Sequence, residues 1–251
     1  MNKLKKISAL IRKALTAFFL YFFSDEKCAV CGTNAPFSLC FSCSVQLRKN
    51  IVYDVQKRCK KCGRLLLGEN EVCTECRENE VLYADGCFSF FSYRLWAKNM
   101  LFMWKMQEKR AMGYFFSSCI NEFLNQKFNK HNMPVIVPVP PRPHKIKRKG
   151  WDQIDDLCRF LSSLYGFKIF RALYRSSENQ QKKLGRKERL AFASSSYHLN
   201  KKVLSKCKVL PREAVLIDDV FTTGSTVREC ASLLKTCGIP KVYALTIFIV
   251  D

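Results

Sequence analysis

The stretch that decides the fold is Ala214-Val-Leu-Ile-Asp-Asp-Val-Phe-Thr-Thr-Gly-Ser-Thr226, in a chain of 251 residues. It opens with an apolar run suited to a buried strand, which leads into two adjacent carboxylates, Asp218 and Asp219. A turn rich in hydroxyl groups follows, and helical periodicity begins at about Ser225. At the carboxyl end of a parallel strand, such a turn lies in the crevice where α/β folds bind their ligands.

The turn itself has the composition of a phosphate-binding loop. Backbone N–H groups at a helix N-terminus can surround a phosphate together with nearby hydroxyls. The hydroxyls belong to Thr222, Thr223, Ser225 and Thr226, and Gly224 lets the backbone approach closely. The preceding carboxylates can accept hydrogen bonds from vicinal ribose hydroxyls, and carboxylate near phosphate favours Mg²⁺ between them. The alternative is a helix capped after an acidic turn, which explains one hydroxyl but not the full string.

Strands and helices alternate on both sides of this stretch. We expect strands at 87–93, 135–139, 215–217 and 242–250, and helices at 95–128, 152–165 and 225–237. Gly238 and Pro240 end the last of these helices. This order predicts the α/β class, with a parallel sheet covered by helices. Residues 171–213 are polar and basic, and no period stands out in them.

Four Cys-x-x-Cys pairs precede this α/β region. Their members are Cys28 and Cys31, Cys40 and Cys43, Cys59 and Cys62, and Cys73 and Cys76. Zinc prefers a tetrahedron of thiolates, and each such pair presents two of them on a tight turn. Eight cysteines therefore predict two Cys₄ zinc sites, with adjacent pairs combined in preference to interleaved ones. Gly32 and Gly63 directly follow the second Cys of a pair, a position that often needs a left-handed backbone.

Both zinc sites would be closed, so we interpret them as structural. A segment of about fifty residues has a small core, and metal binding would supply much of its folding energy. The alternatives, a disulfide framework or an iron–sulfur cluster, suit the regular spacing and a reducing compartment less well.

The N-terminal segment, residues 1–26, indicates in which cellular compartment the protein lies. Leu4, Ile7, Ile11, Leu15, Phe18 and Phe22 recur at helical spacing. Arg12 and Lys13 interrupt the apolar run, which leaves ten uncharged residues, far too few to span a bilayer. We expect an amphipathic helix that packs on its own protein, in preference to one on a membrane surface. The sequence thus predicts a cytoplasmic protein with no transmembrane segment.

Two stretches carry a resemblance to known families. Residues 214–226 resemble the phosphoribosyl-pyrophosphate-binding motif of type I phosphoribosyltransferases. The stretch Val137-Pro-Val-Pro-Pro-Arg-Pro-His-Lys-Ile-Lys-Arg-Lys-Gly-Trp-Asp-Gln153 is similar to a ComF-family segment that reads VPVP, a basic run and then GFNQ. With the Cys pairs ahead of it, the chain resembles the ComF family, which is related to bacterial competence factors of natural transformation. After the helix expected at 1–26 from its apolar spacing, the resemblance implies a double zinc ribbon (27–80) and a phosphoribosyltransferase-like domain (81–251).

The resemblance also implies roles for individual residues. Asp218 and Asp219 would face the ribose hydroxyls, and residues 222–226 would hold the 5′-phosphate. The turn from Val137 to Pro140, with Pro138 and Val139, would lie where the family places its pyrophosphate loop. Lys105 looks like the lysine of an LKY-type segment that neutralises phosphate. Gln181, Leu184, Arg186 and Arg189 look like the family's Q-x-x-L-x-R-x-x-R stretch.

Three positions depart from the family's pattern. Asp152 stands where Asn is usual, Phe192 where the family tends to have Asn, and Ser195 where it tends to have Gly. These positions lie in regions that shape the second-substrate pocket, so they bear on the transfer reaction more than on the phosphosugar site.

The charge balance favours polyanionic partners. There are 43 Lys and Arg against 21 Asp and Glu, a formal net charge of +22. Basic runs lie at 142–149, 182–189 and 201–208. Arg142 and its neighbours can bind the pyrophosphate of a small ligand or follow a nucleic-acid backbone, with Trp151, Phe192 or Tyr197 as stacking partners.

Two functions stay open on this basis. One is an accessory protein of DNA uptake that binds phosphoribosyl pyrophosphate or a nucleotide and engages single-stranded DNA or a DNA-processing protein. The other is a Mg²⁺-dependent phosphoribosyltransferase acting on a nucleobase or related acceptor. The first is slightly favoured, and no residue is assigned as a general base.

Overall fold

The structure is a computed structural model that describes residues 27–35, 38–52, 57–78, 82–94, 96–143, 145–176 and 196–251. The predicted helix at 1–26 lies outside these ranges. So do the residues matched to the family's Q-x-x-L-x-R-x-x-R stretch, together with Phe192 and Ser195.

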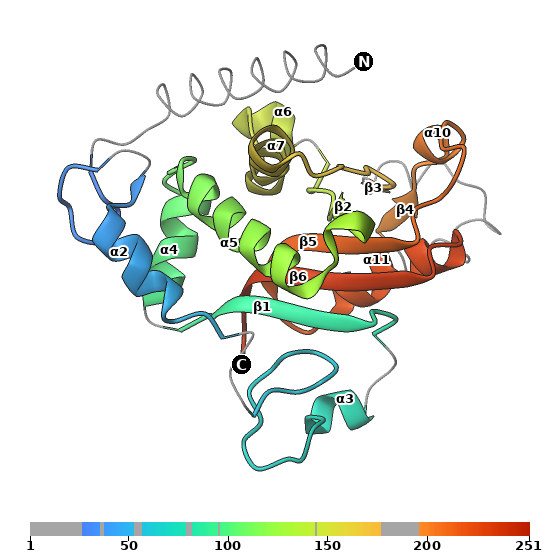
Figure 1. The fold of residues 1–251 in the computed structure, drawn as a ribbon, viewed down its shortest axis with the longest axis horizontal. Coiled ribbons are helices and arrows are strands. Elements are labelled where there is room, and N and C mark those ends of the chain that lie inside the picture. Colours follow the sequence, from blue (N-terminus) through green and yellow to red (C-terminus); the bar gives the residue numbers. More distant parts are fainter. Residues whose placement is uncertain are drawn as a thin grey trace.

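Four parallel strands form the central sheet. They are β1 (Gly86–Ser92), β2 (Val135–Pro138), β5 (Glu213–Phe221) and β6 (Lys241–Ile249), in the order β1-β6-β5-β2 (Figure 1). The strands read as nearly continuous apolar runs because both faces of a parallel sheet are covered. The predicted α/β class with a parallel sheet is confirmed.

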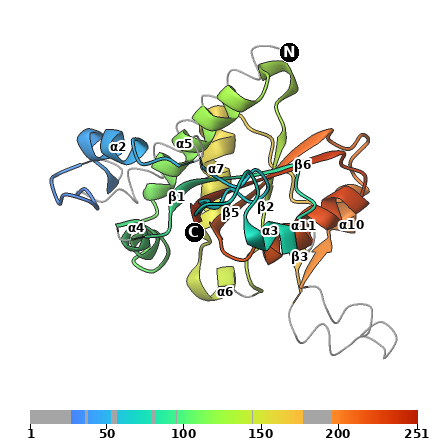
Figure 2. The ribbon, with the colours of Figure 1, turned by 90° about the horizontal axis from the view of Figure 1, so that it is seen from below.

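Helices cover the two faces of this sheet. On one face lie α4 (Trp96–Lys105), α5 (Met112–Lys127) and α7 (Gln153–Tyr165), and on the other lies α11 (Ser225–Thr236) (Figures 1 and 2). Alternate residues of β5 divide between two cores, as strand geometry requires. Val215 and Ile217 pack in the core with α5, and Ala214 and Leu216 pack in the core with α11.

Smaller elements complete the described chain. They are α2 (Phe41–Arg48), α3 (Thr74–Glu78), η2 (Lys130–Asn132), α6 (Lys145–Lys149) and α10 (Lys201–Leu204). Strands β3 (Leu173–Arg175) and β4 (Tyr197–Leu199) form a separate antiparallel pair. This pair and α10 lie in the region where the sequence showed no period.

Two sequence predictions need correction. The single helix expected at 95–128 is wrong, because α4 and α5 are separated by a turn at 106–111. Residues 107–110 are all polar or charged and continue no apolar face, and Glu108 has a φ of 57°, which a helix excludes. The strand expected at 215–217 is longer than predicted, since β5 runs to Phe221. Asp218 and Asp219 therefore belong to the strand itself.

The Cys-rich segments lie on opposite faces of the sheet. The first ribbon, residues 27–52, packs beside α4 and α5 through buried Cys28, Leu39 and Leu47. The second ribbon, residues 57–78, shares the core of α11 through Cys59 and Leu66. In Figure 2, α3 of the second ribbon lies on the same side of the sheet as α11, and α5 lies on the other side. Each ribbon thus covers part of one sheet face.

A buried ion pair fixes the second ribbon to the sheet. The two terminal nitrogens of Arg58, Nη1 and Nη2, donate to the Asp251 carboxylate at 3.0 and 3.2 Å. The Leu65 N–H donates to the same carboxylate at 2.9 Å, and the Ser92 hydroxyl also donates to it. The side chains of Arg58 and Asp251 are 10% and 2% exposed. Burial acts to raise the pKa of Asp251, but the hydrogen bonds from Ser92, Arg58 and Leu65 outweigh it and lower the pKa.

Replacing this carboxylate tests the anchor. We expect Asp251→Asn to lower the free energy of unfolding at pH 7 by about 3 kcal/mol, because it leaves Arg58 buried without its counter-charge. Because the folded protein has the lower pKa, the ionic contribution is present at neutral pH and is lost as the pH falls below about 4. Urea denaturation followed by circular dichroism measures the difference. The control is Glu71→Gln, which removes the exposed partner of Lys60 in the same ribbon and should change little. Equal effects of the two substitutions would contradict the anchor.

Candidate functional site

The carboxyl end of the sheet opens into a cleft of about 910 Å³. Its walls come from β5, the end of α4, the segment 139–154 and the β3–β4 pair. Seven residues predicted from the sequence line it: Lys105, Val139, Arg142, Asp218, Asp219, Thr222 and Thr226. The fold therefore brings together residues from segments more than a hundred positions apart, at the edge where parallel sheets bind ligands.

The two carboxylates form the floor of the cleft. Asp219 is 8% exposed, and its Oδ2 accepts hydrogen bonds from Lys105 Nζ and Gln153 Nε2, each at 2.6 Å. Its backbone N–H donates to Asp218 Oδ1 at 2.8 Å. Lys105 ends α4 and Gln153 begins α7, so two helix termini hold a carboxylate supplied by β5.

The environment of Asp218 disfavours its charge. Burial and then the neighbouring Asp219 carboxylate raise the pKa of Asp218 to about 8, although Lys105 acts in the opposite direction. At neutral pH the pair therefore retains a proton more readily than two separate carboxylates would. A ligand that donates hydrogen bonds or brings a cation would favour the fully ionised pair.

The predicted phosphate loop lies at the start of α11. Gly224 precedes the first helical residue with a φ of 80°, in the left-handed region. A Cβ there would lie 2.8 Å from Phe221 Cζ and 2.9 Å from Leu82 Cδ2, so glycine also meets a steric need. The Thr223 and Ser225 hydroxyls are 3.1 Å apart.

Not every predicted residue lines the cleft. Within the loop, Thr223 and Ser225 are exposed and Gly224 is buried. Pro138 ends β2 and pairs with Ile217. In the sequence, these four residues are neighbours of residues that do line the cleft. Thr223, Gly224 and Ser225 lie between Thr222 and Thr226, and Pro138 precedes Val139. Arg142 is exposed on the loop after β2, where it borders the cleft.

The departure at Asp152 has a structural explanation. Asp152 is the N-cap of α7, and its Oδ1 accepts from the N–H groups of Ile154 and Asp155 at 3.0 and 3.1 Å. Its Oδ2 binds Lys145 Nζ at 2.6 Å. An aspartate thus caps the helix and also fixes the basic segment that forms one wall of the cleft.

Three cleft residues were not assigned a role there from the sequence. Gln153 lies in the stretch 137–153 that resembles the ComF family, but nothing in the sequence indicated that it binds Asp219. Arg175 and Tyr197 come from the β3–β4 pair, and the Arg175 guanidinium carbon lies 5.0 Å from the Tyr197 ring centroid. Tyr197 was considered only as a partner for nucleic acid, and Arg175 lay in the region without a period.

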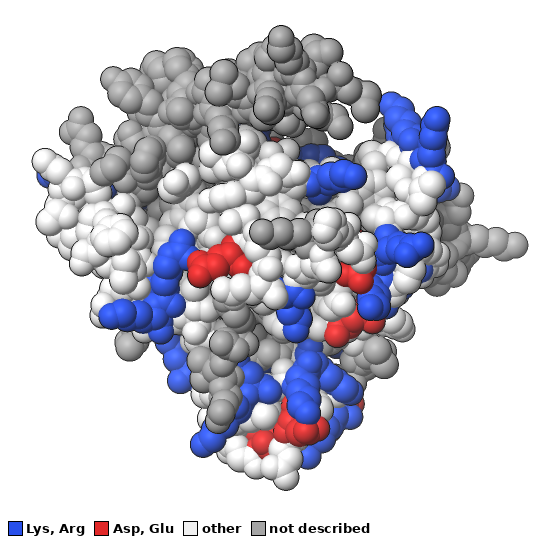
Figure 3. Space-filling view, in the orientation of Figure 1, with Lys and Arg blue, Asp and Glu red and all other residues white. Residues whose placement is uncertain are grey.

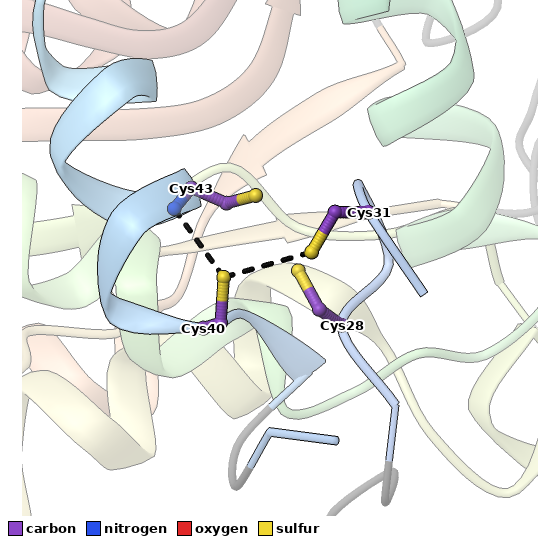
Figure 4. A group of neighbouring side chains, drawn as sticks. All are labelled: Cys28, Cys31, Cys40 and Cys43. Carbon is purple, nitrogen blue, oxygen red and sulfur yellow. Dashed lines mark hydrogen bonds between the residues drawn. The ribbon is translucent and has the colours of Figure 1, made fainter. Parts of the chain in front are cut away.

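The eight predicted ligands form two Cys₄ groups. Cys28, Cys31, Cys40 and Cys43 make one, and Cys59, Cys62, Cys73 and Cys76 make the other; within each group the sulfur atoms lie within 4.8 Å of one another. The predicted combination of adjacent pairs is confirmed. Figure 4 shows the four sulfur atoms of the first group converging, two from the loop at 28–31 and two from the start of α2.

The spacing of the sulfur atoms suits zinc. The Cys31 and Cys40 sulfurs are 3.7 Å apart, and those of Cys62 and Cys73 are 3.6 Å apart. A tetrahedron with Zn–S bonds of about 2.3 Å has edges of about 3.8 Å. A disulfide requires about 2.05 Å, and all these cysteines are free. Both groups can therefore hold a structural zinc ion.

Thiol acidity within the groups also favours a cation. A hydrogen bond from the Thr33 side chain lowers the pKa of Cys31 to about 6, whereas burial raises the pKa of Cys43. Burial acts to raise the pKa of Cys59, but backbone hydrogen bonds outweigh it and leave the pKa at about 7. Burial raises the pKa of Cys62. Some thiols thus ionise readily, but four adjacent thiolates need a metal cation to offset their charge.

The two groups differ in access to solvent, which leads to a test. Cys31 is exposed in the first group, whereas Cys59, Cys62 and Cys73 are buried in the second. We expect purified protein to carry about two equivalents of zinc and a chelator to remove one equivalent faster. A colorimetric chelator measures the release. The Cys28→Ser variant should lack the fast equivalent, and Cys59→Ser should lack the slow one. Protein without metal, or one uniform rate, would refute this expectation.

Among the residues that the structure describes, no helix has the length and apolar character needed to cross a bilayer.

Comparisons with known proteins identify relatives along most of the chain. No protein-family model matches it. Competence protein ComFC of Streptococcus pneumoniae is 24% identical over 230 residues, covering 86% of this chain and 96% of the relative. Competence protein F of Haemophilus influenzae is 24% identical over 228 residues, covering 88% of this chain and 95% of the relative. The chain is thus similar along most of its length to two proteins named as competence proteins, and it carries two Cys₄ groups packed on a parallel α/β sheet.

Proposed function

We propose that the cleft binds a phosphosugar of the phosphoribosyl pyrophosphate type together with Mg²⁺. The observation that carries the proposal is the placement of Asp218 and Asp219 directly ahead of a glycine- and hydroxyl-rich loop that opens α11. The carboxylates suit the ribose hydroxyls, and the N–H groups and hydroxyls of the loop suit the 5′-phosphate.

Each group then has a defined part in ligand binding. Thr222 and Thr226 face the cleft and can donate to the 5′-phosphate. Lys105 binds Asp219 in the free protein and lies where it can turn to a pyrophosphate, with Arg142 on the opposite loop. A bound Mg²⁺ ion would offset the charge of the pyrophosphate oxygens. Asp219, held by Gln153, keeps its orientation when Lys105 leaves.

The names of the relatives and the charge support a role in competence. Both relatives are called competence proteins. This chain carries a net charge of +22, and Figure 3 shows Lys and Arg side chains spread over one face, with fewer Asp and Glu among them. We propose an accessory role in DNA uptake, in the cytoplasm, where the protein binds single-stranded DNA or a DNA-processing protein through backbone phosphate contacts.

An active phosphoribosyltransferase is the second candidate. The cleft continues from the carboxylates to Arg175 and Tyr197, which leaves room beside the ribose for a flat acceptor such as a nucleobase. No residue is assigned as the general base. A pyrophosphate-release assay with a panel of nucleobases separates the two candidates, since binding without release supports the accessory role.

The binding site is tested by calorimetric titration with phosphoribosyl pyrophosphate and Mg²⁺. We expect the parent protein to bind and the Asp218→Asn, Asp219→Asn double variant to bind at least about 100-fold more weakly, because both charged acceptors are lost. The control is Glu122→Gln, which neutralises a surface carboxylate paired with Arg48, away from the cleft. No binding by folded, zinc-loaded parent protein would refute the proposal.

The affinity should also depend on pH. The pKa of Asp218 is raised to about 8, so a ligand that needs the ionised pair must displace a proton at lower pH. We expect the affinity to rise about tenfold from pH 7 to pH 9 and then to level off. The ligand's own phosphates ionise near pH 6, outside this window. Titrations of the parent and of Asp218→Asn at four pH values measure the effect, and an equal pH dependence in the variant would exclude Asp218 as its source.

A further inference from the structure

The second ribbon contacts the phosphate loop directly. Arg64 donates from Nη2 to the backbone carbonyl of Thr222, across 158 positions of sequence. Thr222 is the first residue of the loop and lines the cleft. The Arg64 side chain is only 19% exposed, so the contact lies within the interface between ribbon and sheet.

The same guanidinium is held from its other side. Arg64 Nη1 pairs with the Glu75 carboxylate. Arg64 lies two positions after Cys62, and Glu75 lies between Cys73 and Cys76, so the pair joins the two Cys-x-x-Cys turns of the second group. A planar guanidinium bound at two nitrogens has little rotational freedom. Its orientation toward Thr222 therefore depends on both turns being held together.

Apolar packing supports the same interface. Leu82, four residues beyond the ribbon, lies against the loop, since a Cβ on Gly224 would come within 2.9 Å of its Cδ2. Gly63 lies close to the Cys87 carbonyl of β1, where a Cβ would be 3.1 Å from the oxygen. The backbone beside Arg64 is thus seated on the sheet.

The contact has a chemical consequence for the loop. In a planar trans peptide the C=O and the N–H point in opposite directions. A guanidinium that holds the Thr222 carbonyl toward the ribbon therefore directs the Thr223 N–H away from it. Loop N–H groups are the donors that a phosphate requires, so the orientation of this peptide affects the affinity for phosphate.

We propose that Arg64 is a positioning residue of the phosphate loop and that metal in the second Cys₄ group, but not in the first, sets the affinity of the cleft for its ligand. The inference rests on the proposed function in so far as it concerns a phosphosugar. The first ribbon provides the contrast, because its Arg48 binds Glu122 and Ser118 of α5, on the opposite face of the sheet.

The test uses full-length, zinc-loaded protein with Arg64→Met and the matched control Arg48→Met. Binding of phosphoribosyl pyrophosphate with Mg²⁺ is measured by calorimetry, zinc content by metal analysis, and exchange of the amides at 222–226 by hydrogen–deuterium mass spectrometry. We expect Arg64→Met to keep two zinc equivalents, to bind about tenfold more weakly and to exchange these amides faster. Arg64→Lys should restore part of the affinity, since one ammonium can reach the carbonyl but cannot also hold Glu75 in the same geometry. Arg48→Met should match the parent in affinity and in exchange of the amides at 222–226.

The metal dependence is tested by single-site loss. We expect Cys59→Ser to weaken binding and to speed exchange at 222–226, and Cys28→Ser to leave both unchanged. If the parent binds and Arg64→Met equals it in affinity or in loop exchange, the inference is overturned while the proposed function stands. If the parent does not bind, the proposed function fails, and loop exchange alone still decides whether Arg64 positions the loop. Equal effects of Cys28→Ser and Cys59→Ser overturn the specific role of the second group.

Discussion

Adjacent carboxylates at the end of a buried strand carry an electrostatic cost that the surrounding chain must offset. Asp218 and Asp219 belong to β5, which lies between β6 and β2 in the sheet. Lys105 at the end of α4 and Gln153 at the start of α7 both bind Asp219. Two helices on one face of the sheet must therefore end or begin at this point, which fixes where the cleft opens. The raised pKa of Asp218 shows that the compensation is incomplete in the free protein.

The two ribbons add to the cover of the sheet faces, although each is a short segment. A helix covering a sheet face needs a broad apolar surface, and each ribbon supplies only a few buried residues. Metal bound by the two Cys₄ groups would replace the missing core, because the binding free energy of the ion is then folding free energy. The second ribbon also gains the buried Arg58–Asp251 pair, so its position on the sheet is fixed by charge as well as by packing.

The features that follow from local chemistry were predictable from the sequence. The strand, loop and helix from Ala214 onward, and the combination of adjacent Cys pairs, depend on residue type and spacing within a few tens of positions. The break between α4 and α5 was missed because the apolar residues on both sides share a helical period, and the polar run at 107–110 was not weighed against it.

The polar contacts between distant segments could not be predicted from the sequence, for a different reason. Nothing in the residue types indicates that Gln153 meets Asp219, or that Arg64 reaches a carbonyl 158 positions away. Such contacts depend on where the fold brings two segments, and a backbone carbonyl is present at every position. The resemblance gave the residues around the loop, but not the arginine that holds its backbone.

The strand order has a consequence for synthesis of the chain. The edge strand β1 ends at Ser92 and pairs with β6, which begins at Lys241, 149 positions later. At roughly 5–20 residues per second, a ribosome leaves β1 without its neighbour for on the order of ten seconds. During that interval the Cys pairs have already emerged, and their ligands are contributed within a short local span. Both ribbons can thus bind zinc while the chain is still being synthesised. Two folded ribbons would then precede an unpaired, aggregation-prone strand until β6 pairs with it.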